Sequence, residues 1–160
     1  MKFLPAPWRW DFISTMNTKA KPCIFCAAEK LPDEKSLVIF RGKKFFIILN
    51  KYPYNSGHIM IAPYEHLKSP DQLKPGDLLE MMELQNKSLK ILNESFHPEG
   101  FNIGMNIGKV AGAGIKDHFH LHIVPRWGGD SNFMAVTSET KVLSYDMTSV
   151  FKILSEAYQK

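Results

Sequence analysis

The chain has 160 residues, of which 44% are hydrophobic, and a formal net charge of +4. This length fits one domain with one core, and the apolar runs of the chain, such as Phe45 to Leu49, are far shorter than the ~20 residues that span a bilayer. The basic residues form no dense stripe of the kind that binds nucleic acid. We therefore expect a cytoplasmic protein that binds neither membrane nor nucleic acid, and whose mild positive charge suits a small anionic substrate.

In chain order, residues 1–20 mix proline and tryptophan without a clear period and predict an arm laid over the core. Two β-rich runs at 37–41 and 43–50, separated by Gly42, predict a hairpin. A turn at 51–57 and a third strand at 58–63 follow.

Residues 74–96 predict the longest helix, with Pro75 near its start and Pro98 and Gly100 after its end. Its apolar residues at helical spacing predict the buried face: Leu78, Met82, Leu89, Leu92 and Phe96. A strand at 101–106, a glycine-rich loop at 108–114, a strand at 118–125 and a last helix at 149–158 complete the pattern. Hairpins around one long helix indicate an α+β fold with an antiparallel sheet.

The strand at 118–125 alternates histidines with apolar residues. Because side chains alternate between the two faces of a strand, the histidines share one face and the apolar residues face the core. The alternating residues are His118, Phe119, His120, Leu121, His122 and Ile123. Three imidazoles in a row are a costly way to build a core, since each needs hydrogen-bond partners. The segment therefore indicates a functional site.

Two functions fit such a row of histidines. One is direct metal chelation, which needs a further ligand downstream, and no histidine follows His122. The other is phosphoryl or nucleotidyl transfer, in which a neutral imidazole attacks phosphorus and a second imidazole hydrogen-bonds the phosphate or the leaving group. The glycine-rich loop directly before the histidines favours the second, because small residues let backbone N–H groups approach phosphate oxygens.

The two cysteines of the chain, Cys23 and Cys26, have C-x-x-C spacing. A disulfide is not expected in a reducing cytosol. Metal binding and redox chemistry are the functional interpretations, and a pair of half-buried small hydrophobic residues is the alternative.

Several of these segments together resemble the histidine triad (HIT) family. The resemblance covers residues 20–135 and rests on the triad itself, the C-x-x-C pair, Asn50, the segments 56–63 and 111–115, and residues 125–130. The start at 6–9, Asn106 and the pair Arg126 and Trp127 make the chain most similar to the bacterial branch of diadenosine tetraphosphate phosphorylases and hydrolases. The resemblance implies a HIT-like fold, a five-stranded antiparallel sheet with one long central helix and a C-terminal helix. We expect a single HIT domain over 1–160, with an arm at 1–20, a core at 21–135 and a C-terminal extension at 136–160.

The resemblance also implies an enzyme that cleaves dinucleoside polyphosphates. His120 would attack the α-phosphate and form a nucleotidyl-histidine, His122 would contact the phosphate or the leaving group, and His58 would orient His120. The implied substrate-binding residues are Asn50, Asn106, Gly112, Ala113, Gly114 and Ile115, the last four through their backbone amides. An adenosine phosphoramidase or general nucleotidyl hydrolase is the alternative enzyme, and a non-catalytic nucleotide sensor is the alternative of another class.

Zinc-containing members of the family imply a metal site in this chain. The matching ligands are Cys23, Cys26, His66 and His118, and two cysteines with two histidines make a closed, structural zinc site. No organic cofactor is expected. The resemblance further implies a homodimer with a joined sheet.

Overall fold

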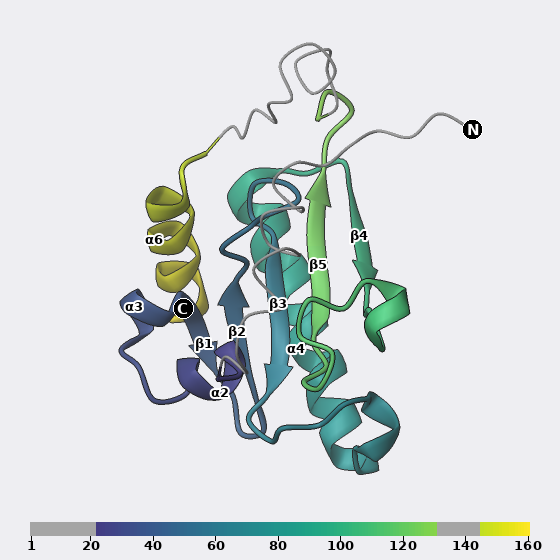
Figure 1. Cartoon of the computed structure of the whole chain (residues 1–160). Helices are drawn as coiled ribbons and strands as arrows, with labels where there is room; N and C mark the ends of the chain where they lie inside the picture. The colour runs from purple at the N-terminus through teal and green to yellow at the C-terminus, as the bar shows by residue number, and fades with distance from the viewer. Residues whose placement is uncertain (1–21, 131–144) are drawn as a thin grey trace, which may run out of the picture.

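The structure, a computed structural model, describes residues 22–130 and 145–160. The expected N-terminal arm lies outside these residues. A five-stranded antiparallel sheet forms the centre, with strand order β1-β2-β3-β5-β4 (Figure 1). Its strands are β1 (Val38–Arg41), β2 (Phe45–Leu49), β3 (Ile59–Pro63), β4 (Gly100–Gly104) and β5 (Leu121–Arg126). The helices are α2 (Ile24–Ala28), α3 (Asp33–Ser36), α4 (Pro75–Phe96) and α6 (Met147–Tyr158), with short 3₁₀ helices at Pro70–Gln72 and Lys109–Ala111.

The predicted hairpin around Gly42 joins β1 to β2. The Gly42 N–H donates to the carbonyl of Phe45 at 2.8 Å, and the Glu80 carboxylate of α4 accepts from the next two N–H groups of the turn. A Cβ at Gly42 would lie 2.7 Å from Glu80 Oε1. Glycine therefore lets the turn sit directly on α4.

Both faces of the sheet are covered, which explains why β2 and β3 are buried along their whole length. One face packs against α4 and α6, and its core includes Ile47, Leu121 and Leu92. The opposite face carries a smaller apolar cluster in which Phe46 and Met60 meet Phe25 of α2. Over residues 22–130 and 145–160, no helix combines the length and the hydrophobicity that crossing a bilayer requires.

Helix α4 was predicted at almost its observed bounds, but its buried face was predicted only in part. Leu92 and Phe96 are buried as expected, whereas Leu78 and Met82 are 37% and 44% exposed. The residues buried instead are Met81, Leu84, Ser88 and Ile91. The helix carries apolar residues on more than one side, so their spacing alone does not determine which side meets the sheet.

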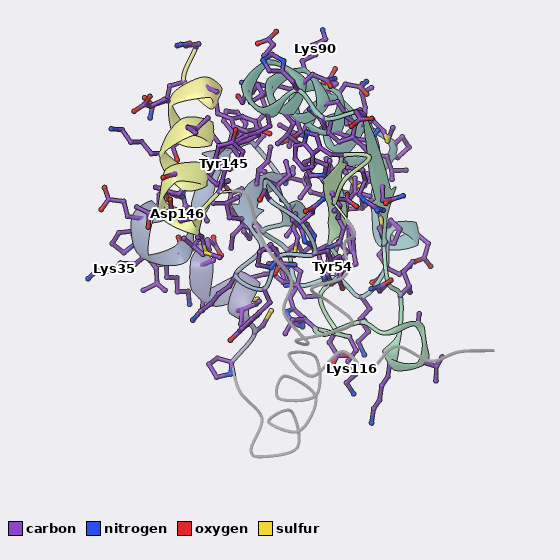
Figure 2. All side chains as sticks on the ribbon, turned by 90° about the horizontal axis from the view of Figure 1, so that it is seen from above. Lys35, Tyr54, Lys90, Lys116, Tyr145 and Asp146 are labelled. Carbon is purple, nitrogen blue, oxygen red and sulfur yellow. The ribbon has the colours of Figure 1, made fainter. Side chains whose placement is uncertain are left out.

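Helix α6 packs on β1 and α4 and covers part of the core that lies between the sheet and α4. Asp146 caps it by accepting from the N–H groups of Thr148 and Ser149 at 3.0 Å, so the helix begins two residues before the predicted start (Figure 2). At its other end, the buried hydroxyl of Tyr158 donates to Ser88 Oγ of α4 at 2.6 Å. The predicted helix is thus packed into the domain through one face, which buries Val150, Leu154 and Tyr158.

Candidate active site and metal site

The three imidazoles of the triad lie on the face of the sheet opposite α4, as the alternation predicted. Phe119, like the apolar residues that follow it at alternate positions, belongs to the core under α4. The regular strand β5 begins only at Leu121, so His118 and His120 belong to the segment before it. That segment is held by a hydrogen bond from the Phe119 N–H to the carbonyl of Leu67 at 2.8 Å.

His120 is 5% exposed and has a defined tautomer. Its Nδ1 lies 3.1 Å from the carbonyl oxygen of His118, which can only accept, so Nδ1 carries the proton and donates it. The lone pair of a neutral His120 is therefore on Nε2. Burial lowers the pKa of His120 below its usual value, although the hydrogen bond to His118 acts in the opposite direction. The ring is thus a neutral base at neutral pH, and no residue of 22–130 or 145–160 hydrogen-bonds its Nε2.

A hydrogen-bond chain fixes the neighbouring ring of His122. Nδ1 of His58 accepts from the Tyr54 N–H at 3.0 Å and lies 3.3 Å from Asn50 Nδ2, so its proton is on Nε2. That Nε2–H donates to Nδ1 of His122 at 2.9 Å, which leaves His122 with a proton on Nε2. Burial, and then the nearby His120, lower the pKa of His122 to about 4. His122 therefore remains a neutral hydrogen-bond donor at physiological pH.

The turn before β3 places the ring of His58 within hydrogen-bond distance of His122. Gly57 has a φ of 74°, a left-handed conformation that favours glycine. Asn50 uses its amide within the turn, since Oδ1 accepts from the Tyr52 N–H at 2.9 Å while Nδ2 faces His58. Its predicted contact with substrate remains a prediction, and the structure gives it a role in orienting His58. The sequence did not single out Tyr54, whose ring lies 4.8 Å from that of His58.

The glycine-rich loop contains the short 3₁₀ helix Lys109–Ala111 and a left-handed Gly112 with a φ of 84°. The N–H groups of Gly112 and Ala113 donate to carbonyls of the loop itself, at 3.1 and 3.3 Å. Within residues 22–130 and 145–160, no hydrogen bond is found for the N–H groups of Gly114 and Ile115. Of the four predicted amides, these two have no partner among the described residues, and their contact with a phosphate stays a prediction.

The face that carries this loop is opposite to α4. In the view from above, Lys116, two residues after the loop, and Lys90 of α4 lie on opposite sides of the molecule (Figure 2). Asn106 is half-buried and lies in the connection between β4 and this loop, because β4 ends at Gly104 and not at the predicted residue 106. Its contact with substrate stays a prediction. His97 is exposed at the end of α4.

The four predicted metal ligands converge. One ligand atom from each of Cys23, Cys26, His66 and His118 lies within 4.8 Å of all the others. Cys23 Sγ is 3.3 Å from Nδ1 of His118, Cys26 Sγ is 3.2 Å from Nδ1 of His66, and the two Nδ1 atoms are 3.3 Å apart. Nε2 of His118 donates to the carbonyl of Pro63 at 2.9 Å, which leaves Nδ1 free to bind a metal.

These distances fit a tetrahedral ion. Zn–S bonds of ~2.3 Å and Zn–N bonds of ~2.0 Å at the tetrahedral angle place sulfur and nitrogen ligands ~3.5 Å apart and two nitrogen ligands ~3.3 Å apart. With two sulfurs and two imidazoles, every position of the tetrahedron is filled by protein. The donor set therefore suits a structural zinc and leaves no open position for substrate.

The short helix α2, which the sequence did not predict, carries the cysteines. Cys23 immediately precedes it and Cys26 lies within it. Arg41 of β1 donates to the carbonyls of Ala28, Glu29 and Leu31, at and beyond the C-terminal end of α2. Between the cysteines, Phe25 is 1% exposed and its ring centroid lies 5.0 Å from that of His118 and 4.8 Å from that of His120. Its position in C-x-F-C is the only sequence signal for this contact.

Comparison with known proteins identifies relatives of this chain in sequence and in structure. The family model of the HIT domain matches residues 32–129. An AP-4-A phosphorylase of Mycobacterium tuberculosis is 33% identical over 161 residues, covering 96% of this chain and 83% of the relative. An asymmetrical bis(5'-nucleosyl)-tetraphosphatase of Schizosaccharomyces pombe is 27% identical, in a match that covers 77% of this chain and 68% of the relative. The crystal structure of a Zn-bound histidine triad family protein from Mycobacterium smegmatis has a TM-score of 0.67 at 27% identity, over 86% of this chain and 93% of that one.

Proposed function

The chain belongs to the histidine triad (HIT) family, and from this premise we propose that it is a nucleotidyl hydrolase or phosphorylase that cleaves dinucleoside polyphosphates such as diadenosine tetraphosphate. The observation that carries the proposal is the hydrogen bond from Nδ1 of His120 to the carbonyl of His118, which leaves Nε2 as a nucleophile for phosphorus. The relatives named AP-4-A phosphorylase and bis(5'-nucleosyl)-tetraphosphatase support the substrate class.

In the first step, the lone pair on Nε2 of His120 attacks the α-phosphorus. The bond from that phosphorus to the bridging oxygen breaks, and its electron pair leaves on the departing polyphosphate. The product is a nucleotidyl-histidine whose imidazolium Nδ1–H still donates to the carbonyl of His118. The Nε2–H of His122 and the N–H groups of Gly114 and Ile115 would donate to phosphate oxygens as negative charge develops on them.

In the second step, inorganic phosphate or water attacks the same phosphorus, and the phosphorus–nitrogen bond breaks with its electron pair returning to Nε2 of His120. From diadenosine tetraphosphate, phosphate gives ADP and ATP, whereas water gives AMP and ATP. We favour phosphate as the acceptor because the relative that is 33% identical over 96% of this chain is named a phosphorylase. Asn106 and Asn50 are proposed to contact the nucleotide, the latter in addition to its bond with His58.

The test is incubation of the purified protein with diadenosine tetraphosphate, with and without inorganic phosphate, followed by chromatography of the nucleotides. ADP and ATP that form only with phosphate support a phosphorylase. AMP and ATP without phosphate indicate an asymmetric hydrolase, and two ADP without phosphate indicate symmetric cleavage. Turnover of adenosine phosphoramidate alone indicates the alternative enzyme. Binding without turnover of either compound indicates a sensor and contradicts the proposal.

Zinc is the metal that we propose for the cluster of Cys23, Cys26, His66 and His118. Its support is the match between the interatomic distances and tetrahedral coordination, together with the zinc-bound relative from Mycobacterium smegmatis. When bound, zinc would cross-link α2 to the segments that carry His66 and His118. Metal analysis of the purified protein beside a Cys23→Ser variant tests this, and a parent protein without zinc would contradict it.

A homodimer is also proposed, and the edge of the sheet supports it. Strand β4 is an edge strand whose Ile103 is 41% exposed. Ile103 pairs with Ile123, which is buried against α4, so Ile103 lies on the same face of the sheet as α4. An edge with an exposed apolar side chain favours pairing with a second copy. Light scattering should give a dimer for the parent and a monomer for Ile103→Lys; a monomeric parent contradicts the proposal.

A further inference from the structure

Helix α2 contacts both the candidate metal cluster and the candidate nucleophile. Cys23 and Cys26 belong to the cluster, and Phe25 between them packs on the ring of His120. We propose that metal binding at this cluster holds His120 in its reactive orientation, through the ring of Phe25 and through the backbone carbonyl of His118. The inference rests on the proposed role of His120 as the nucleophile.

The first connection is the side chain of Phe25, which acts as a positioning residue. Its ring lies against the rings of both His118 and His120, on the inner side of α2. A five-residue helix is far too short to be stable alone, so the place of α2 depends on its tertiary contacts. If α2 moves, the wall beside His120 moves with it, and the imidazole gains room to rotate away from the attacking geometry.

The second connection is His118, which links the two sites through a single residue. Its Nδ1 faces the sulfur of Cys23, and its Nε2–H is held by the carbonyl of Pro63. Its own carbonyl accepts from Nδ1 of His120 at 3.1 Å. Coordination that fixes the ring of His118 therefore also fixes the acceptor that selects the tautomer of His120. Without that acceptor, the proton of a neutral imidazole is no longer confined to Nδ1.

Loss of the metal is expected to loosen α2 without unfolding the domain. In the metal-free cluster, the contacts that remain among the described residues are thiol–imidazole contacts of 3.2 to 3.6 Å and the contact between the two imidazoles at 3.3 Å, and a thiol is a weak donor. The other end of α2 stays anchored, because the hydrogen bonds from Arg41 to the carbonyls of Ala28 and Leu31 do not involve the metal. The main core under α4 contains no member of the cluster.

The direct test is a comparison of the zinc-loaded and chelated protein by ¹H–¹⁵N NMR of the histidine rings. His120→Asn identifies the signals of His120, and circular dichroism establishes that the chelated protein is folded. With zinc, His120 is expected to show a single Nδ1–H tautomer with slow exchange of that proton. After chelation, the signals should change to a mixture of tautomers with fast exchange. Identical signals for His120 in both folded forms would overturn the inference.

Two matched variants distinguish a positioning role of Phe25 from a contribution to stability alone. They also test the inference if the chelated protein does not stay folded. Phe46 lies in the same apolar cluster and its ring meets Phe25 and Tyr64, but among the described residues it has no ring contact with a histidine. Both Phe25→Leu and Phe46→Leu should lower the thermal midpoint. Only Phe25→Leu should also slow single-turnover formation of nucleotidyl-His120, by about 10- to 100-fold, a size typical of ~1 Å misplacements. Zinc content and nucleotide affinity should be unchanged.

Equal slowing by both leucine variants, or slowing by neither, contradicts the positioning role of Phe25. The NMR comparison needs no substrate. If the zinc-loaded parent forms no nucleotidyl-histidine at all, the proposed function fails, and the tautomer of His120 still decides whether the metal site controls that ring.

Discussion

Replacement of His58 by asparagine tests the hydrogen-bond chain behind the triad. The asparagine amide reaches about as far as Nδ1 of histidine, so it can still accept from the Tyr54 N–H. It has no counterpart of Nε2, which donates to Nδ1 of His122 across 2.9 Å. A buried polar group that loses its partner costs about 1–3 kcal/mol. Because each 1.4 kcal/mol of barrier is about tenfold in rate, we expect kcat to fall about 5- to 150-fold, while KM changes little.

The assay is steady-state release of nucleotide from diadenosine tetraphosphate, with thermal unfolding to establish that the variant is folded. His97→Asn is the matched control, because His97 is exposed at the end of α4 with a φ of 47°, a conformation that asparagine tolerates. This control should keep the parental kcat. A folded His58→Asn protein with the parental kcat would contradict the role of His58 in orienting His122, as would an equal loss in the control.

Three further predictions concern stability. Ser88→Ala should destabilise the protein by about 1–3 kcal/mol in urea unfolding, because it leaves the buried Tyr158 hydroxyl without its acceptor. Tyr158→Phe should cost only about 1 kcal/mol, because the Ser88 hydroxyl still donates to a main-chain carbonyl. A larger loss for Tyr158→Phe than for Ser88→Ala would contradict this. Gly42→Ala should cost about 1–3 kcal/mol in thermal unfolding, since the added Cβ meets Glu80 Oε1 at 2.7 Å. Burial lowers the pKa of His122 from 6.5 to about 4, so the unfolded chain takes up the proton first and stability should fall as pH drops from about 6.5 towards about 4. Urea midpoints across this range should fall less for His122→Asn than for the parent.

The sequence predicts the parts of this fold in which local pattern and tertiary structure agree. The strands of the hairpin and β3 follow from short β-rich runs and the position of Gly42, α4 follows from helical spacing, and the face on which the histidines lie follows from alternation. In these cases the residues themselves carry the pattern. The cluster of Cys23, Cys26, His66 and His118 that the structure brings together was implied by the resemblance to zinc-containing members of the family, with the C-x-x-C spacing as its local signal.

What the sequence misses depends on contacts between distant segments. Helix α2 has only five residues and is held by Arg41 and its apolar neighbours, so no local signal predicts it. The exposed Leu78 and Met82 are apolar residues on a side of α4 that does not meet the sheet. The use of the Ala113 N–H within its own loop follows from the left-handed backbone conformation of Gly112, which composition does not specify.

The most direct measurement is mass spectrometry of the protein quenched during turnover of diadenosine tetraphosphate, with peptides mapped at a pH that preserves phosphorus–nitrogen bonds. We expect a nucleotidyl group on the peptide that contains His120, attached to that ring, and none in His120→Asn, which should still bind nucleotide. An adduct on another residue, or turnover that survives in His120→Asn, would contradict this expectation.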